Sequence, residues 1–436
     1  LGANSVSGGY EIDNSLRFDK GSSAHLSRTL ADSDEKIWTY STWVKTCIGT
    51  NEVTLLRISP NDDTIDNIVI STSGNLQYQV RRAPTNHAYV NTNQKLRDPS
   101  AWYHIVVAVD TTQSTDTNRI KFYINGNQVT SFASATYPDQ NFAGAINGNS
   151  EHVISEFRET GGDGTRYSDM YLAETHFIDG VAAQTDFGEF DDNGVWIPKA
   201  YDGSYGTNGF YLEYKETGTD ADASGMGADT SGEDNHFTSA GLAATDVTTD
   251  TPTNNFMTLN SALADGQFNT SELSEGNTFY NSDQGNDGAG QPTGTFAVTS
   301  GKWYWEVKVP SAQNSRSIGI VNMDRVSIDR PPQLHGSGFT ATNSTVSVNF
   351  QDLTADQVDK AGTHTQEQAS LASFANNDIY GIYLNMDDGN IRFYKNGSAY
   401  TNQFDLDDLA DWQSGGAVPT ASGASYQAYL FNFGNP

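Results

Sequence analysis

The sequence contains two copies of the strongest short signal for a β-hairpin, an Asn-Gly pair between two strand-like runs. The first copy is the run Lys121–Val129, which has Asn125 and Gly126 at its centre. The second surrounds Asn396 and Gly397. A type I′ turn needs positive φ at both central positions, which Asn and Gly adopt at low cost. The two copies therefore predict antiparallel sheets in both halves of the chain.

Short strand-like runs fill both halves, whereas helical periodicity is weak throughout. Ile105–Val109 is continuously apolar, as in a strand covered on both faces, while Gln77 and Gln79 alternate with apolar neighbours, as in a half-exposed one. Trp303–Val309 alternates strictly, so Trp303 and Trp305 share one face and are expected in a core or interface. The expected strands are Ser15–Phe18, Ile37–Thr46, Glu52–Ile58, Asn67–Ser71, Leu76–Val80, Trp102–Asp110, Ile120–Ile124, Leu172–Ile178, Phe296–Thr299, Lys302–Val309, Ser317–Val321, Thr345–Phe350, Ile379–Leu384, Ile391–Lys395 and Tyr426–Phe433. These runs predict an all-β protein of two tandem β-sandwiches.

The chain of 436 residues is long enough for two or three domains. We place the first sandwich in residues 1–187, a partly ordered, irregular connector in 188–255, and the second sandwich in 256–436. Within the connector, Phe210–Tyr214 is expected to add an edge strand to either sandwich. The Gly-, Asp- and Ser-rich stretch Gly218–Glu233 is expected to be an extended or mobile excursion over the surface.

The net charge of −30 argues against a nucleic-acid partner, because phosphate binding needs clustered Lys and Arg. No apolar run approaches the length of a membrane span, so membrane insertion is not expected. The single cysteine, Cys47, excludes an intramolecular disulfide and lies in a strand-like run, where a buried thiol is expected.

Two groups of segments carry a family resemblance. The first group resembles laminin-G-like modules of the lectin/glucanase type: Leu16–Phe18, Trp38–Val44, Trp102–Ala108, Phe122–Gly126 and Ala173–Gly180. The second group resembles SPRY domains: Gly301–Val307, Ser317–Ile320, Tyr380–Tyr383, Ile391–Gly397 and Phe431–Gly434. Both families have the concanavalin A-like jelly roll, so the resemblance implies two such sandwiches in tandem.

The connector is similar to a segment that joins this pair of modules in proteins of marine bacteriophages. The similar stretches are Asp186–Gly188, Gly194–Lys199, Tyr205–Phe210 and Asp250–Asn255. This resemblance implies a protein of the virion surface, made in the host cytoplasm without a signal peptide, which fits the lack of disulfides. It also implies other virion proteins as partners and a homo-oligomer, with a trimer as the candidate state because tail fibres are usually trimers. Because the chain begins with Leu1 and similar proteins continue with a proline-rich segment, we expect a longer natural polypeptide.

Catalytic residues are not expected. Glucanases of this fold carry an E-x-D-x-x-E cluster on one strand, and the nearest match, Glu189–Gly194, lacks the last Glu. Glu174 and His176 lie two apart in an expected strand and so share a face, but a solvent-facing or domain-facing pair is the preferred interpretation.

Calcium is the one candidate cofactor, because laminin-G-like modules sometimes hold this ion at a loop rim through Asp carboxylates. The candidate ligands are Asp62, Asp63, Asp66, Asp163 and Asp169 in the first region, and Asp283, Asp287, Asp387 and Asp388 in the second. Their spacing is irregular, and ordinary turn aspartates are the alternative interpretation.

Aromatic side chains in expected loops are the candidates for stacking on a sugar ring. They are His87, Tyr89, Tyr137, Tyr280 and Trp412. The leading hypothesis is a non-enzymatic tail-fibre or adhesin segment that binds a host-surface glycan or receptor. The alternative is a structural decoration protein of the capsid, neck or tail, and a glycan depolymerase is the least favoured because it lacks the paired carboxylates.

Overall fold

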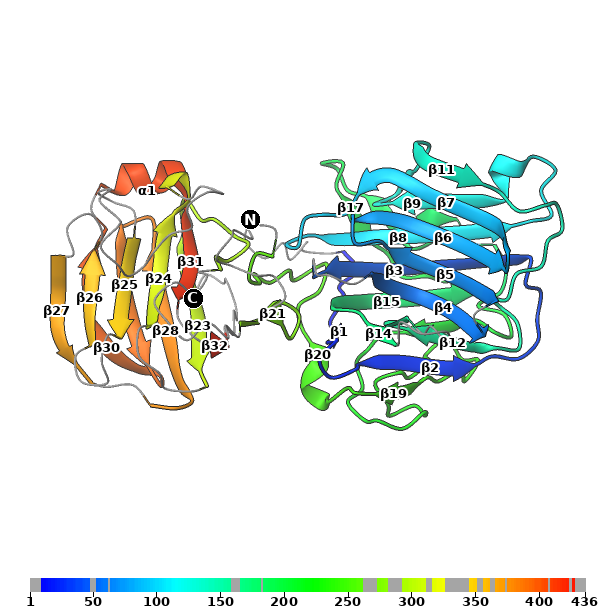
Figure 1. Ribbon diagram of the computed structural model, residues 1–436. Helices are drawn as coiled ribbons and strands as arrows, with labels where there is room; N and C mark the ends of the chain where they lie inside the picture. The colour runs from blue at the N-terminus through cyan, green and yellow to red at the C-terminus, as the bar shows by residue number, and fades with distance from the viewer. Residues whose placement is uncertain are drawn as a thin grey trace. The chain divides into compact units, whose positions relative to one another are not determined.

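The computed structural model forms two compact units, Asn4–Asn255 and Phe256–Pro436, here called the first and second modules (Figure 1). The structure describes residues 9–47, 52–61, 63–157, 165–181, 183–261, 273–280, 292–310, 316–325, 345–350, 356–360, 365–372, 375–406, 408–422 and 426–427.

The first module is built from two antiparallel sheets, here sheet A and sheet B. In the described residues, sheet A has the order β10-β9-β8-β3-β15-β1-β20, with β18 also paired to β15, and sheet B has the order β11-β7-β6-β5-β4-β12-β2-β19. The strands of sheet A are β1 (Ser15–Phe18), β3 (Ile37–Thr46), β8 (Trp102–Asp110), β9 (Ile120–Ile124), β10 (Asn127–Gln128), β15 (Met170–Ile178), β18 (Phe210–Leu212) and β20 (Val247–Thr248). The strands of sheet B are β2 (His25–Thr29), β4 (Val53–Asn61), β5 (Thr64–Ile70), β6 (Asn75–Arg82), β7 (Thr85–Lys95), β11 (Phe132–Thr136), β12 (Glu151–Ile154) and β19 (Thr238–Ala240).

The main core of this module contains the inward side chains of both sheets, among them Trp38 of β3 and Tyr78 of β6, whose rings meet edge to face at 5.6 Å. β8 is covered on both faces, as its continuous apolar run predicted. Ile105 and Val107 are buried in the main core, and Val106 is buried in a separate cluster on the other face.

The outer face of sheet A is covered by the segment that follows Phe187. Trp196 packs with Trp43 and Trp102 in one cluster, and Phe187 and Tyr205 pack with Val106 in another. This segment contains the hairpin β16 (Gly188–Phe190) and β17 (Trp196–Pro198).

The rest of residues 188–255 also belongs to the first module by its contacts. β18 pairs with β15, β19 with β2 and β20 with β1, so the chain adds strands to both sheets. The expected surface excursion over Gly218–Glu233 is not seen, because Met226 is 1% exposed and lies in the main core. The apolar side chains in this Gly-rich stretch are too widely spaced to show a period.

The second module also contains two antiparallel sheets. In the part of the chain that the structure describes, their orders are β21-β22-β32-β23-β28-β29-β30 and β27-β26-β25-β24-β31. The strands of the first are β21 (Leu273–Ser274), β22 (Phe279–Tyr280), β23 (Lys302–Val309), β28 (Asp378–Asn385), β29 (Asn390–Lys395), β30 (Ser398–Asp405) and β32 (Tyr426–Gln427). Those of the second are β24 (Arg316–Asn322), β25 (Thr345–Phe350), β26 (Asp356–Lys360), β27 (Thr365–Leu371) and β31 (Ala417–Ser422), and one short helix, α1 (Leu409–Gly415), precedes β31.

Both Asn-Gly hairpins form as predicted. φ is 47° at Asn125 and 74° at Gly126, and 49° at Asn396 and 76° at Gly397, which is the positive-φ pair of a type I′ turn. The all-β, two-sandwich fold class is therefore confirmed.

Two smaller expectations are also met. Trp305 is 1% exposed in the core of the second module, with Trp303 packed against that core, and Cys47 is a buried free thiol whose pKa is raised by burial. None of the helices in the described ranges has the length and apolarity that crossing a membrane requires.

Candidate functional site

Three of the five aromatic candidates lie at one edge of sheet B. His87 and Tyr89 are on the strand β7, so the expectation that they lie in a loop is wrong. Tyr137 directly follows β11, whose Thr136 pairs with Tyr89. All three side chains are partly exposed. His87 stacks on Phe142 at 4.6 Å and Tyr137 packs against the main core, so Tyr89 is the one of the three with its side chain on the outer face of the sheet.

The other two aromatic candidates, Tyr280 and Trp412, are core residues, and their assignment as exposed loop aromatics is wrong. Tyr280 is 0% exposed on β22, and Trp412 is 1% exposed on α1. Each belongs to the core cluster of the second module. The short elements that carry them lie among polar, Gly-rich residues, and for this reason their sequence resembles a loop.

Around Tyr89, side chains of three adjacent strands form two rows on the outer face of sheet B. The register aligns Gln77 of β6, Asn91 of β7 and Ser134 of β11 in one row, and Gln79, Tyr89 and Thr136 in the other. We call these six side chains the amide face. Their neighbours along β6 and β7, Leu76, Tyr78, Val80, Ala88 and Val90, are buried in the main core. Side chains directly opposite one another are about 5 Å apart, so each row is a continuous strip.

The amide face is uncharged and rigidly supported. Its six members are amides, hydroxyls and one phenol, all partly or fully exposed. Gln79 Nε2 donates to Asn86 Oδ1 at 3.1 Å, which orients that amide, while Asn91 Oδ1 is buried and accepts no hydrogen bond from the described residues. Amides and hydroxyls can both donate and accept, and an aromatic ring offers an apolar surface beside them. This is the chemistry that a sugar ring requires.

The sequence indicated this face only in part. The alternation of Gln77 and Gln79 marked β6 as half-exposed, and the same alternation continues in β7. β11 carries no such pattern, because four of its five residues are exposed. Ser134 and Thr136 were therefore missed.

The calcium candidates do not form a metal site in the described ranges, where no group of three acidic, His or Cys side chains has suitable geometry. Asp62, Asp163, Asp283 and Asp287 lie outside the described residues. Asp63 is exposed at a turn, and the carboxylates of Asp387 and Asp388 accept hydrogen bonds from Gly301 N and Asn385 Nδ2.

The two remaining candidates, Asp66 and Asp169, are occupied by internal partners. Asp66 is 0% exposed, forms an ion pair with Arg82 at 2.5 Å, and accepts from Ala145 N. Asp169 is 8% exposed and pairs with Lys20 Nζ at 2.6 Å. Each carboxylate already has a cation beside it, so their assignment as calcium ligands is not supported by this geometry.

Glu174 and His176 do lie together, but on a bulge. The interpretation of this pair as facing solvent or a neighbouring domain is wrong, because both side chains are buried against tyrosines of the first module. The β15–β3 register shifts between Ala173 and His176, and Glu174 has a φ of 49°. His176 Nε2 is 3.5 Å from Glu174 Oε2, and both side chains are buried. The hydroxyls of Tyr10 and Tyr211 donate to the Glu174 carboxylate at 3.0 and 2.7 Å.

Glu174, His176 and the three tyrosines Tyr10, Tyr205 and Tyr211 form a cluster that joins separate segments of the first module. The Tyr211 ring stacks on His176 at 4.3 Å, and His176 Nδ1 hydrogen-bonds Tyr205 OH at 2.9 Å. Burial, and then the Glu174 carboxylate, raises the pKa of Tyr211, so its hydroxyl keeps its proton and remains a donor. Both oxygens of Glu174 accept from hydroxyls of the protein itself, and the cluster ties the N-terminal segment and β18 to β15.

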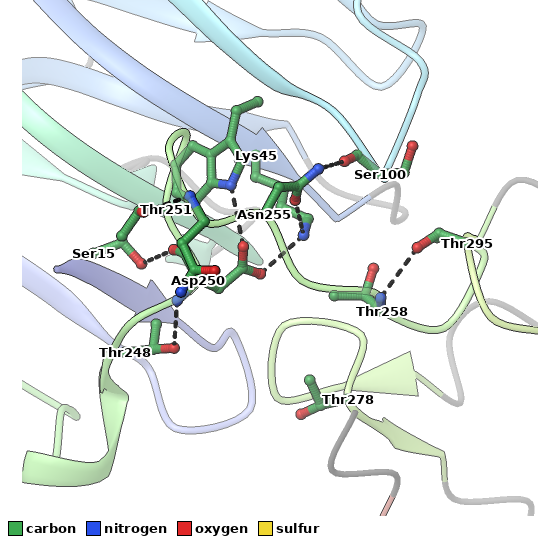
Figure 2. A network of polar contacts seen from close by, with 12 residues as sticks. Ser15, Lys45, Ser100, Thr248, Asp250, Thr251, Asn255, Thr258, Thr278 and Thr295 are labelled. Atoms are coloured by element: carbon green, nitrogen blue, oxygen red, sulfur yellow. Dashed lines mark hydrogen bonds and ion pairs between the residues drawn. The ribbon is translucent and has the colours of Figure 1, made fainter. Parts of the chain in front are cut away.

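A second polar network holds the end of the first module (Figure 2). We call Ser15, Lys45, Trp102, Asp250 and Asn255 the exit network. Lys45 Nζ donates to Asp250 Oδ2 at 2.8 Å and to Asn255 Oδ1 at 2.9 Å, with Lys45 1% and Asp250 4% exposed at the side chain. Trp102 Nε1 donates to Asp250 Oδ1 at 3.1 Å, and Ser15 Oγ donates to Asp250 O at 2.6 Å. The last residues of the module are thus fixed to β1, β3 and β8.

The chain matches two family models. Residues 18–160 match the concanavalin A-like lectin/glucanases superfamily, and residues 302–436 match the SPRY domain. No match is found among curated protein sequences.

Three of the solved structures to which this chain is similar are the following. The PSpry domain of TRIM65 is 16% identical, with 40% of this chain and 88% of that chain covered and a TM-score of 0.30. A heptameric SAP-like pentraxin from Limulus polyphemus is 16% identical, with 40% and 80% covered and a TM-score of 0.29. Domains LG4-5 of the mouse laminin alpha1 chain are 10% identical, with 97% and 88% covered and a TM-score of 0.30.

Each matched segment lies within one of the two modules. Residues 18–160 lie within the first module and 302–436 within the second. Domains of these two kinds are generally non-catalytic binding modules. The chain therefore carries a laminin-G-like domain of the concanavalin A-like lectin/glucanase superfamily followed by a SPRY domain.

Proposed function

We propose that this protein is a non-enzymatic adhesin segment on the outside of a bacteriophage particle, and that its first module binds an uncharged glycan of the host surface through the amide face. The amide face carries the glycan proposal. It is a partly exposed strip of three adjacent strands, with Tyr89 beside amides and hydroxyls of both neighbouring strands.

Charge favours an uncharged glycan over an acidic one. The six side chains of the face carry no charge, and the protein as a whole has a net charge of −30. An acidic polysaccharide would be repelled at long range and would find no cation in either row of the face. A neutral sugar loses nothing to this repulsion, and its hydroxyls match the amides.

A rigid sheet is a suitable support for such a weak site. The buried neighbours of the amide face are core residues, so little ordering is required when a ligand binds. Repetition on a particle would supply avidity, so that each copy can bind weakly and the whole still attach firmly. The position on a phage particle is supported by the resemblance of the connector and by the acidic, disulfide-free composition.

The test is binding of the purified chain to an array of neutral and acidic bacterial glycans, and to a panel of marine bacterial strains. Saturable, strain-restricted binding that Tyr89→Ala abolishes is the expected result. Tyr383→Ala is the matched control, because Tyr383 is a partly exposed tyrosine on β28 of the second module. Binding to no glycan and no strain would instead favour a structural decoration protein, and release of reducing sugar would indicate a depolymerase.

The same experiment is to be repeated with a calcium chelator. Asp66 and Asp169 are paired with Arg82 and Lys20, so glycan binding at the amide face is expected to be unaffected. Loss of binding with the chelator would contradict the assignment of the site to the amide face.

A further inference from the structure

The large exposed apolar side chains of the described residues all lie in one short part of the first module. They are Val181, Phe190 and Val195, at 64%, 49% and 55% exposure. Phe190 and Val195 belong to the β16–β17 hairpin, on either side of its turn. Exposed apolar side chains that lie close together are typical of interaction sites.

This hairpin is held firmly at its base. Trp196 Nε1 donates to His104 Nδ1 at 3.0 Å, and the Trp196 ring stacks on His104 at 5.8 Å. Gly126 and Gly188 make room for this ring, because a Cβ at either position would lie within 2.5 Å of it. The hairpin is therefore anchored to the outer face of sheet A by a buried tryptophan.

The turn is also rigid. Asp191 Oδ1 accepts from the backbone N–H groups of Asn193 and Val195 at 2.9 and 2.7 Å, and these bonds, that of Val195 first, lower the pKa of the Asp191 carboxyl. Asp191 N donates to Val195 O at 2.8 Å. A partner would thus meet a preformed tip and would not have to order it.

The tip presents apolar groups on two sides with acidic groups around them. Phe190 pairs directly with Trp196 in the register and its ring packs edge-on against the indole at 4.9 Å, so it lies on the sheet side of the hairpin. Val195 precedes Trp196 and lies on the opposite side. Glu189 and Asp192 are exposed beside them.

We propose that the tip of the β16–β17 hairpin is a docking knob for a different protein, one with an apolar pocket ringed by Lys or Arg that encloses Phe190 and Val195 together. Charge selects this partner. A second copy of the chain, with 54 acidic and 24 basic residues, offers a repelling surface, and an anionic lipid membrane does the same. The knob lies on sheet A, whereas the amide face lies on sheet B, so the two sites are independent.

The test uses random 12-residue peptides displayed on yeast, selected on the full chain and counter-selected on the Phe190→Ser/Val195→Ser variant. Selected peptides are expected to combine apolar residues with Lys or Arg. Their affinity should fall at least tenfold with either single variant, because a pocket that encloses the tip buries both side chains. Glu189→Gln/Asp192→Asn should weaken binding less, and added salt should remove that difference.

Three controls keep the outcome interpretable. Val181→Ser removes another exposed valine, outside the hairpin, and Tyr89→Ala removes the aromatic ring of the amide face; neither should change peptide affinity. Val195→Ser leaves the Phe190–Trp196 contact in place, so it tests the knob even if Phe190→Ser unfolds the hairpin. Equal thermal melting of the variants establishes that folding is intact.

Several results would overturn the proposal. Peptides that bind the wild type and the double variant alike, or that carry no excess of Lys and Arg, would show that the tip is not a docking knob of this chemistry. Phe190-dependent self-association in sedimentation would show that the partner is a second copy of the chain and not a different protein. Phe190-dependent binding to phosphatidylcholine vesicles would show that the tip binds a membrane and not a protein.

Discussion

Replacement of Lys45 by Met should strongly destabilise the first module, because it leaves a buried carboxylate without its cation. Lys45 and Asp250 are 1% and 4% exposed at the side chain and 2.8 Å apart. In the variant, Asp250 keeps the hydrogen bond from Trp102 but loses the ion pair with Lys45. Met has nearly the volume of the Lys stem, so the cavity contribution is small.

The magnitude follows from the burial of the pair. Breaking a buried ion pair by removing one partner costs about 3–5 kcal/mol, whereas an exposed pair is worth about 0–1 kcal/mol. For a module of this size, each kcal/mol lowers the melting temperature by roughly 2–4 °C. The expected decrease is therefore on the order of 10 °C. Loss of the Lys45 bond to Asn255 adds to it in the same direction.

Differential scanning calorimetry and urea unfolding would measure this change. Lys215→Met is the matched control, because Lys215 pairs with Glu213 at 2.7 Å with 46% and 28% of the side chains exposed, and its loss should cost under about 1 kcal/mol. The double variant Lys45→Met/Asp250→Leu should regain much of the loss, because no buried charge remains. A Lys45→Met decrease no larger than that of Lys215→Met would refute the reasoning.

The other predictions concern binding, pH and the second module. Tyr89→Ala should reduce glycan affinity about tenfold or more, measured by calorimetry, because the ring is the aromatic surface of the amide face. It should change the melting temperature little, because the ring is partly exposed and is not part of the main core. Burial lowers the pKa of His104 to about 3 and that of His152 to about 4. As the pH falls, the unfolded chain therefore binds these two protons at a higher pH than the folded chain does. The free energy of unfolding should fall as the pH drops below 6.5, and each histidine should account for about 2–3 kcal/mol of the loss at pH 4.5. Urea unfolding at a series of pH values measures this loss, and a free energy of unfolding that does not change with pH would contradict the prediction. Trp412→Ala should destabilise the second module by about 3–5 kcal/mol and leave the calorimetric transition of the first unchanged; a shift of both transitions would show that they are coupled.

The pH prediction has a geometric basis in the hydrogen bonds of both imidazoles. His104 Nδ1 accepts from Trp196 Nε1, and His152 Nε2 accepts from Asn147 N at 3.2 Å. A proton on either accepting nitrogen would place two donors face to face. The folded module can therefore bind these protons only if it gives up a buried hydrogen bond.

The sequence predicted the fold well where local chemistry decides it. The Asn-Gly pairs at 125–126 and 396–397 set both hairpins, and the unbroken apolar run of β8 marked a strand covered on both faces. Local patterns could not reveal how the segment after Phe187 packs. Its aromatic residues are spaced irregularly, because they fill gaps on an existing sheet and follow no period of their own.

The candidate site was harder to predict because it depends on register. Tyr89 was recognised as an aromatic candidate, but its neighbours Ser134 and Thr136 lie more than 40 positions along the chain and join it only through the β7–β11 pairing. Tyr280 and Trp412 were misassigned for a related reason: a polar sequence context indicates a loop, but the burial of one large ring is set by tertiary packing.

The covering of sheet A by the chain's own aromatic residues bears on where a ligand can bind. Trp196, Phe187 and Tyr205 fill its outer face, and Glu174 there is bonded to Tyr10 and Tyr211. A glycan would have to displace this packed layer to reach β15. The amide face of sheet B needs no such rearrangement, because its side chains are already partly exposed and uncharged. We therefore place the proposed glycan site of the first module on sheet B, and the proposed docking site on the hairpin that packs against sheet A.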